Sequence, residues 1–288
     1  MTLAESLAEY VKACFSGIWI ESHEHDDAIL EIAQLCREED WQLAVWDADA
    51  GLQLPGQAVD ETAAAGSQDP LAALKSLDAM GDPQSSTLLV LRNFHRFLNS
   101  TEIIQAIASQ ISRGKQNRTF VIGLSPVVQI PVELEKQFVV LEHPLPDREQ
   151  LTEIAQGVAT EEGELPEGDS LEAVIDAASG LTRSQAEGAF SLSLVRHGTL
   201  ESEALWGIKA QELKKSGLLS LHQGSESFDN LGGLEALKDF CKQSLRRQSS
   251  EQQPCRAKGV LLLSPPGCGK SQFAKALGHE VGRPTLAW

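Results

Sequence analysis

The sequence predicts an α/β fold in which a three-layer core with a mostly parallel sheet is followed by a helical subdomain. Over residues 1–145, five short apolar segments alternate with amphipathic ones, a pattern typical of parallel strands covered by helices. Over residues 146–220, one helical pattern follows another. The length of 288 residues suits roughly two domains.

Short runs of β-branched, leucine and aromatic residues predict the strands. These strands are Gly17–Glu21, Trp41–Trp46, Thr87–Leu91, Thr119–Leu124 and Phe138–Leu141. Helical spacing of apolar residues predicts helices at Asp27–Arg37, Leu71–Met80 and Thr101–Ser112. Residues 51–70, which contain several Gly, Pro, Ala and Gln residues, are expected to form a loop.

Four further helices are expected in the helical subdomain. They are Asp147–Ala159, Ser170–Ala178, a segment beginning after Thr182, and Glu201–Lys215. Thr182 and Gln185 have the spacing of a capping box, which predicts the start of the third helix.

The charge of the chain is unevenly distributed. The net charge is −17, but residues 221–288 contain nine basic and six acidic residues, so residues 1–220 carry −20. An acidic surface repels nucleic acid, and direct DNA or RNA binding is therefore not expected. The change of charge near residue 220 predicts a domain boundary between residues 220 and 221.

Neither a membrane span nor a signal peptide is expected. The apolar runs are shorter than the ~18 residues that a membrane helix needs, and the N-terminus lacks a basic region. The five cysteines are odd in number and have no Cys-x-x-Cys spacing, which argues against a zinc or disulfide framework. A cytoplasmic location is the expectation.

The sharpest motif is SPPGCGKS at residues 264–271. The apolar Lys258–Leu263, a predicted strand, precedes it and the helical pattern Gln272–Val281 follows, which is the context of a phosphate-binding P-loop. Glycines let the backbone approach a phosphate, amides at a helix N-terminus favour an anion, and the Lys-Ser pair serves the phosphates and Mg²⁺. The predicted nucleotide-binding residues are Ser264, Pro265, Pro266, Gly267, Cys268, Gly269, Lys270, Ser271 and Gln272, with Ser271 as the Mg²⁺ ligand.

Ser264 departs from the P-loop pattern, because a glycine usually stands at this position. Serine is a tolerable but less usual substitute in the tight turn that leaves the strand. The alternative is a helix-capping loop that contains Gly-Lys-Ser by coincidence.

A second motif, FDNLGGL at Phe228–Leu234, lies about thirty residues before the P-loop. Together the two motifs resemble the start of an AAA ATPase domain. The resemblance implies ATP and Mg²⁺ as cofactors, and it implies that Asn230, Leu231 and Gly232 line an adenine pocket through backbone contacts. The alternative is an ordinary turn before a helix.

The front half resembles the N-terminal region of an uncharacterised AAA family found in cyanobacteria and on algal plastid genomes. The segments that carry this resemblance are Thr87–Phe97, Ile130–Glu135, Pro144–Pro146 and Gly180–Thr182. In that family a degenerate ATPase-like domain without a P-loop precedes an active one. The resemblance implies a P-loop NTPase-like (AAA+) core at 1–145, a helical lid at 146–220 and the start of a second AAA+ core at 221–288.

The first domain lacks the residues that an ATPase needs. The turn Ser22–Asp27 contains three carboxylates, which repel a triphosphate but suit the N-terminus of the helix they begin. Arg92 and Asn93 stand where a strand end would hold Mg²⁺ and polarise water, and Ser125 is expected to cap a turn. A metal site at His23–Asp26 is disfavoured, because consecutive side chains diverge. A non-catalytic scaffold is predicted.

The leading hypothesis is an ATP-binding AAA-type ATPase that is incomplete in this chain and unable to hydrolyse ATP alone. No catalytic residue is assigned, because only Thr285–Trp288 follow the P-loop helix, and we expect a longer protein. The resemblance implies a homo-oligomeric ring and an unidentified protein client. The alternative is a non-enzymatic acidic interaction module with a vestigial P-loop. A P-loop kinase or GTPase is disfavoured by FDNLGGL and by the lack of an Asn-Lys-x-Asp motif.

Overall fold

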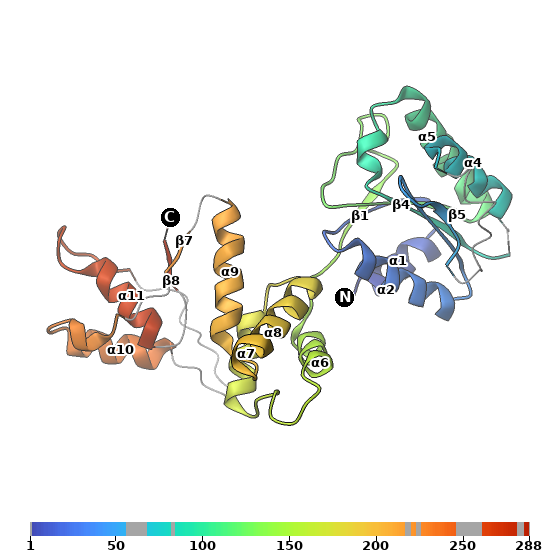
Figure 1. Ribbon diagram of the computed structural model, residues 1–288. Helices are drawn as coiled ribbons and strands as arrows, with labels where there is room; N and C mark the ends of the chain where they lie inside the picture. The colour runs from blue at the N-terminus through green and yellow to red at the C-terminus, as the bar shows by residue number, and fades with distance from the viewer. Residues whose placement is uncertain are drawn as a thin grey trace. The chain divides into compact units, whose positions relative to one another are not determined.

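The computed structural model describes residues 2–55, 68–81, 84–216, 220–222, 226–245, 261–280 and 285–287. Two compact units make up the chain (Figure 1). The first unit comprises residues 1–147 and 182–184, and the second comprises residues 148–181 and 185–288. The boundaries at 145/146 and 220/221 stay predictions.

A six-stranded sheet forms the centre of the first unit. Its strands are β1 (Gly17–Glu21), β2 (Gln42–Asp47), β3 (Gly51–Gln53), β4 (Thr87–Arg92), β5 (Thr119–Ser125) and β6 (Val139–Glu142). Their order is β3-β2-β4-β5-β1-β6. All neighbours are parallel except β2 and β3. The predicted α/β class with a mostly parallel sheet is confirmed.

Helices cover both faces of this sheet (Figure 1). On one face, α1 (Leu3–Lys12) and α2 (His25–Glu38) enclose a core that includes Ile18 and Ile20 of β1. On the other face, α4 (Pro70–Met80) and α5 (Thr101–Asn117) enclose a core that includes Trp19. Successive residues of β1 therefore point into opposite cores, as the pleat of a strand requires, and the predicted three layers are confirmed.

Besides the short 3-10 helix η1 (Phe94–Phe97), two elements of the first unit were not predicted. The expectation of a loop at residues 51–70 is wrong at β3, which pairs with β2. A tight turn after β2 makes this pairing possible. There, Asp47 Oδ1 accepts hydrogen bonds from the amides of Asp49 and Ala50 at 2.9 and 2.6 Å, and Gly51 adopts a φ of 71°. Helix α1 is the second element, and its capping box of Thr2 and Glu5 was visible in the sequence.

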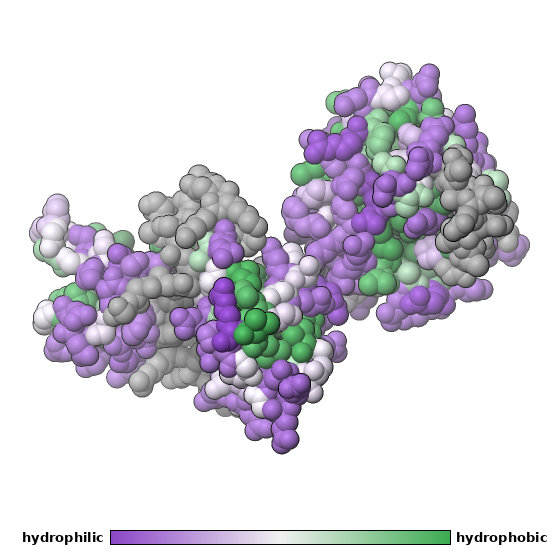
Figure 2. All heavy atoms as spheres, viewed as in Figure 1, coloured by the Kyte–Doolittle hydropathy of each residue, from purple (hydrophilic) through white to green (hydrophobic). Residues whose placement is uncertain are grey.

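Aromatic side chains close the core beyond the end of β4. Trp46 packs edge-on against Phe94 and Phe97, with ring centroids 5.3 and 5.4 Å apart. His95 is also buried, and Phe97 is partly buried against the same core. The visible surface of this unit is mostly hydrophilic (Figure 2).

The second unit begins with the predicted helices, which are confirmed with small shifts at their ends. They are α6 (Arg148–Val158), α7 (Asp169–Ala178), α8 (Arg183–His197), whose first two residues belong to the first unit, and α9 (Ser202–Ser216). Leu151, Val174 and Phe190 share their core, and an ion pair joins Arg148 to Asp176.

The later part of the second unit contains η2 (Phe228–Asn230), α10 (Glu235–Leu245) and α11 (Lys270–Glu280). It also contains an antiparallel pair, β7 (Ser220–His222) with β8 (Thr285–Ala287). Within the described ranges, every helix is too short or too polar to cross a membrane.

Candidate functional site

The P-loop segment Ser264–Ser271 turns sharply into α11, which begins at Lys270. Gly267 and Gly269 have φ angles of 82° and 77°, a region that other residues enter only at a cost. A Cβ added to either glycine would meet open space. The backbone conformation, and not a lack of room, therefore requires glycine at both positions.

The ammonium of Lys270 reaches back over the P-loop. Its Nζ donates to the carbonyls of Ser264 and Pro265 at 2.7 and 3.0 Å, and to the hydroxyl of Ser264 at 3.0 Å. All three ammonium hydrogens are thus used by the loop itself. The backbone of Ser264 does not adopt a positive φ, so no glycine is required there. Its hydroxyl also supplies an acceptor that glycine lacks.

The remaining P-loop positions are open to solvent. Lys270 is partly buried, whereas the other predicted positions are exposed, namely Ser264, Pro265, Pro266, Gly267, Cys268, Gly269, Ser271 and Gln272. The first helical hydrogen bond of α11 runs from the amide of Phe273 to Gly269 O at 2.8 Å. Amides before that point lack intrahelical acceptors, so this helix start favours an anion.

The FDNLGGL motif forms η2 and packs against the helix that follows the P-loop. The rings of Phe228 and Phe273 stack with centroids 5.5 Å apart and an interplanar angle of 24°. Leu231 packs against the same cluster, whereas Asn230 and Gly232 are exposed. Of the hydrogen bonds described, none joins these three predicted adenine-pocket residues to the P-loop. The aromatic pair is the contact that brings the two motifs together.

Lys238 holds this turn in place, a role that the sequence reasoning missed. The residue is only 7% exposed, and its Nζ donates to the carbonyls of Leu231 and Phe228 at 2.6 and 3.2 Å. A lysine four residues into a helical pattern resembles any surface lysine, so only its burial reveals the contact.

The predicted strand before the P-loop is only partly described. Lys258–Val260 lie outside the described residues, and Leu261–Leu263 form no strand, so that part of the prediction is wrong. A strand needs a hydrogen-bonded neighbour, and the one strand pair described in this unit joins β7 to β8. Leu261 and Leu263 are accordingly 82% and 85% exposed.

In the first unit, carboxylates occupy the corresponding turn between β1 and α2. Asp26 and Asp27 lie in the first turn of α2, as expected from the helix dipole. Glu24 is the N-cap residue of α2, although its side chain makes no capping hydrogen bond there. Its two carboxylate oxygens accept from the amides of Arg183 and Ser184, each at 2.7 Å.

The end of β4 carries a basic residue that neutralises neighbouring acids. Arg92 lies 3.0 Å from a carboxylate oxygen of Asp26 and 4.0 Å from one of Asp47. Ser125 donates its hydroxyl to Val127 O at 2.6 Å, which confirms the predicted turn cap. Glu24 and Asp26 contact different partners, so these two side chains diverge as predicted.

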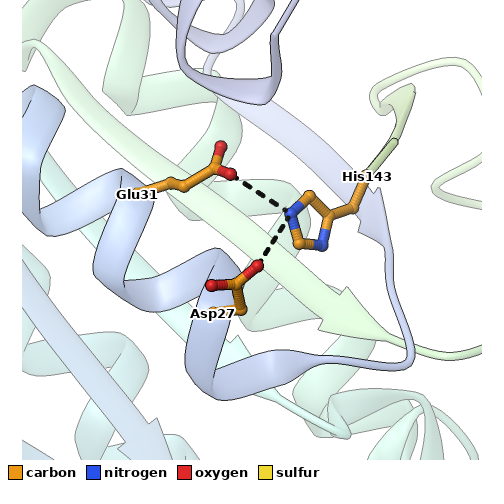
Figure 3. A group of neighbouring side chains, drawn as sticks. All are labelled: Asp27, Glu31 and His143. Atoms are coloured by element: carbon orange, nitrogen blue, oxygen red, sulfur yellow. Dashed lines mark ion pairs between the residues drawn. The ribbon is translucent and has the colours of Figure 1, made fainter. Parts of the chain in front are cut away.

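A different cluster, Asp27, Glu31 and His143, lies beside this turn (Figure 3). One ligand atom from each residue lies within 4.8 Å of the others. Desolvation by burial raises the pKa of Asp27. The i, i+4 spacing of the two acids was the only sequence signal, since His143 reaches them only through the fold.

Two family models match the chain in succession. The model of the SpoVK-like AAA ATPase N-terminal domain matches residues 3–143, and that of the second domain matches residues 148–216. The chain belongs to the SpoVK-like AAA ATPases. This membership confirms the predicted resemblance to AAA ATPases, identifies the fold as a parallel AAA+ core followed by a helical domain, and implies nucleotide binding.

Curated relatives of this SpoVK-like AAA ATPase include uncharacterised proteins of algal plastids. An AAA domain-containing protein named ycf46 from Gracilaria tenuistipitata var. liui is 26% identical over 236 residues, covering 76% of this chain and 46% of the relative. The ycf46 protein of Trieres chinensis is 26% identical over 227 residues, covering 76% and 45%. The chain thus spans about half the length of these relatives.

Solved structures resemble the chain more distantly. The AAA domain of FIGL-1 in complex with ADP has a TM-score of 0.45 at 14% identity, covering 67% of this chain and 70% of that one. PCH-2 of C. elegans has a TM-score of 0.45 at 8% identity, covering 74% and 68%.

Proposed function

We propose that the chain binds ATP with Mg²⁺ at the P-loop segment, and that residues 1–220 form an ATPase-like scaffold without catalytic activity. The observation that carries the proposal is the position of Lys270, whose ammonium contacts a loop in which Gly267 and Gly269 adopt positive φ angles. Family membership supports nucleotide binding in general. The ion pair of Arg92 with Asp26, and the hydrogen bonds that Glu24 accepts from the amides of Arg183 and Ser184, support a first unit that holds no triphosphate.

Each residue has a role in this proposal. The phosphates replace loop carbonyls as acceptors for Lys270, and free amides at the start of α11 donate to them. Ser271 holds Mg²⁺, which neutralises charge on the phosphates. The backbone of Asn230, Leu231 and Gly232 contacts adenine, and Lys238 fixes the conformation of that turn.

The proposal extends to the whole protein, because the relatives are about twice as long as this chain. We infer a homo-oligomeric ring that acts on a protein client in the cytoplasm. Four free cysteines among the described residues agree with a reducing compartment. The net charge of −20 on residues 1–220 argues against nucleic acid as the client.

Cysteine protection tests this nucleotide site in the intact chain. Cys268 is exposed within the P-loop, whereas Cys36 and Cys241 are buried, and burial raises the pKa of Cys36 to about 12. We expect iodoacetamide to label Cys268 faster than these two. Bound ATP is expected to cover Cys268, so that only the ligand-free chain reacts. ATP with Mg²⁺ at ten times its Kd therefore slows the labelling of Cys268 roughly tenfold.

Cys14 is the control, because it is partly exposed and lies in the first unit. Its labelling rate is expected to stay constant when ATP is added. Equal labelling of Cys268 with and without ATP, at a concentration that saturates an independent binding assay, contradicts the site. Absence of any ATP binding favours the acidic interaction module instead.

A further inference from the structure

The cluster of Asp27, Glu31 and His143 joins a helix to the edge of the sheet in the first unit. Asp27 and Glu31 lie one turn apart on α2, and His143 directly follows β6. The imidazole is 5% exposed, and the two carboxylate side chains are 19% and 30% exposed. The site is therefore shielded from bulk water but not closed.

The ring of His143 is held in one orientation by its surroundings. Its backbone amide donates to Glu21 O at 2.9 Å, continuing the pairing of β6 with β1. Its Nδ1 lies 2.8 Å from Ser22 Oγ, within hydrogen-bond distance. The same hydroxyl accepts from the amide of Glu24 at 3.0 Å. These contacts leave Nε2 directed at the two carboxylates (Figure 3).

The distances around Nε2 leave a gap between the three groups. Nε2 lies 3.6 Å from Glu31 Oε1 and 3.9 Å from Asp27 Oδ2, and both separations exceed a hydrogen bond. Ligand atoms about 2.0–2.2 Å from a tetrahedral cation lie roughly 3.3–3.6 Å apart. A small side-chain movement therefore suffices to place all three atoms around one ion.

The charges of the cluster also favour a cation. Two carboxylates face one imidazole, and the other oxygen of Asp27 lies 3.7 Å from Arg183 Nε. With a neutral imidazole, the two carboxylates and the Arg183 guanidinium give the cluster a net charge of −1. A bound dication would change this net charge to +1. A nitrogen ligand with two carboxylate oxygens suits zinc better than magnesium, since magnesium prefers oxygen ligands and water.

We propose that Asp27, Glu31 and His143 form a zinc-type divalent metal site with water as the fourth ligand, and that Ser22 orients the imidazole. Such a site links α2 to β6 next to the turn in which the first unit lacks a P-loop. It stabilises the scaffold and is independent of ATP binding in the second unit.

Zinc titration of the full chain against a chromophoric chelator tests the proposal. Glu31→Gln and His143→Gln are each expected to weaken the tightest zinc site at least tenfold. Ser22→Ala is expected to weaken it by about 10- to 100-fold, as loss of a histidine's hydrogen-bond partner does at other sites. Glu38→Gln, an exposed position on the same helix, is the matched control and leaves affinity unchanged.

Thermal melting with and without zinc separates a metal site from a simple ion pair. Zinc is expected to raise the Tm of the wild-type chain and of Glu38→Gln, but not that of the ligand variants. Equal zinc affinity in wild type and Glu31→Gln overturns the proposal, as does a wild-type Tm that zinc leaves unchanged. If His143→Gln fails to fold, Glu31→Gln decides the matter, because its side chain is partly exposed.

Cobalt substitution identifies the ligand atoms. A thiolate–cobalt absorption band lost on Cys268→Ser would assign zinc to a cysteine and overturn the site. Excess Mg²⁺ is expected not to displace zinc here, whereas it supports ATP binding at the P-loop. Failure of the metal site and failure of the nucleotide site are thereby distinguishable.

Discussion

The 288-residue chain is expected to bind ATP without steady hydrolysis. Turnover needs a group that orients water and an arginine worth ~10³–10⁵ in rate. In the first unit, β4 ends at Arg92, which pairs with Asp26. After the P-loop, the sequence contains one carboxylate, Glu280, and it lies 2.5 Å from Lys242 Nζ.

A phosphate-release assay at saturating ATP and Mg²⁺ checks this expectation. The predicted result is a rate no higher than that of the Lys270→Ala variant under the same conditions. Steady Mg²⁺-dependent release that Lys270→Ala abolishes would contradict it, and would require a catalytic carboxylate at a position that we have not assigned.

Replacement of Lys270 by alanine is expected to lower the affinity for a fluorescent ATP analogue by about 10- to 150-fold. The variant loses charge-assisted hydrogen bonds to the phosphates, worth ~1.5–3 kcal/mol. It also loses the contacts from Nζ to the carbonyls of Ser264 and Pro265, so the empty loop becomes less ordered.

Lys275→Ala is the matched control, because Lys275 has the same charge and lies farther along α11. Its affinity for the analogue is expected to stay within about twofold of the wild-type value, a difference under about 0.4 kcal/mol. Equal affinities of wild type and Lys270→Ala would remove the basis for a P-loop at this position.

The strands and helices of the first unit were largely predictable because their hydrophobic patterns are local. Each parallel strand is a short apolar run. In β1, Ile18, Trp19 and Ile20 are all buried because both faces of the sheet are covered, so apolar and polar residues do not alternate. Strand β3 was missed because its three residues form a strand only through pairing with β2. Helix α1 was missed although Thr2 and Glu5 mark its start.

The candidate sites, too, could be predicted only where their residues are adjacent in the sequence. A P-loop at Ser264–Ser271 could be proposed from the sequence because its residues are contiguous and each has a known chemical role, and its nucleotide-binding role stays a prediction. Lys238 and the cluster at His143 depend on contacts between distant segments, which no spacing rule describes. Leu261–Leu263 has the composition of a strand, but composition does not supply the neighbouring strand that it needs.

Photo-crosslinking with an azido-ATP analogue, followed by peptide mapping of the intact chain, tests most directly which unit holds the nucleotide. The predicted result is labelling within residues 226–245 and 264–272 that unlabelled ATP prevents, with none at Ser22–Asp27. Competed labelling at Ser22–Asp27, or the absence of any competed label in the second unit, would contradict the assignment of ATP to the P-loop and of a scaffold role to residues 1–220.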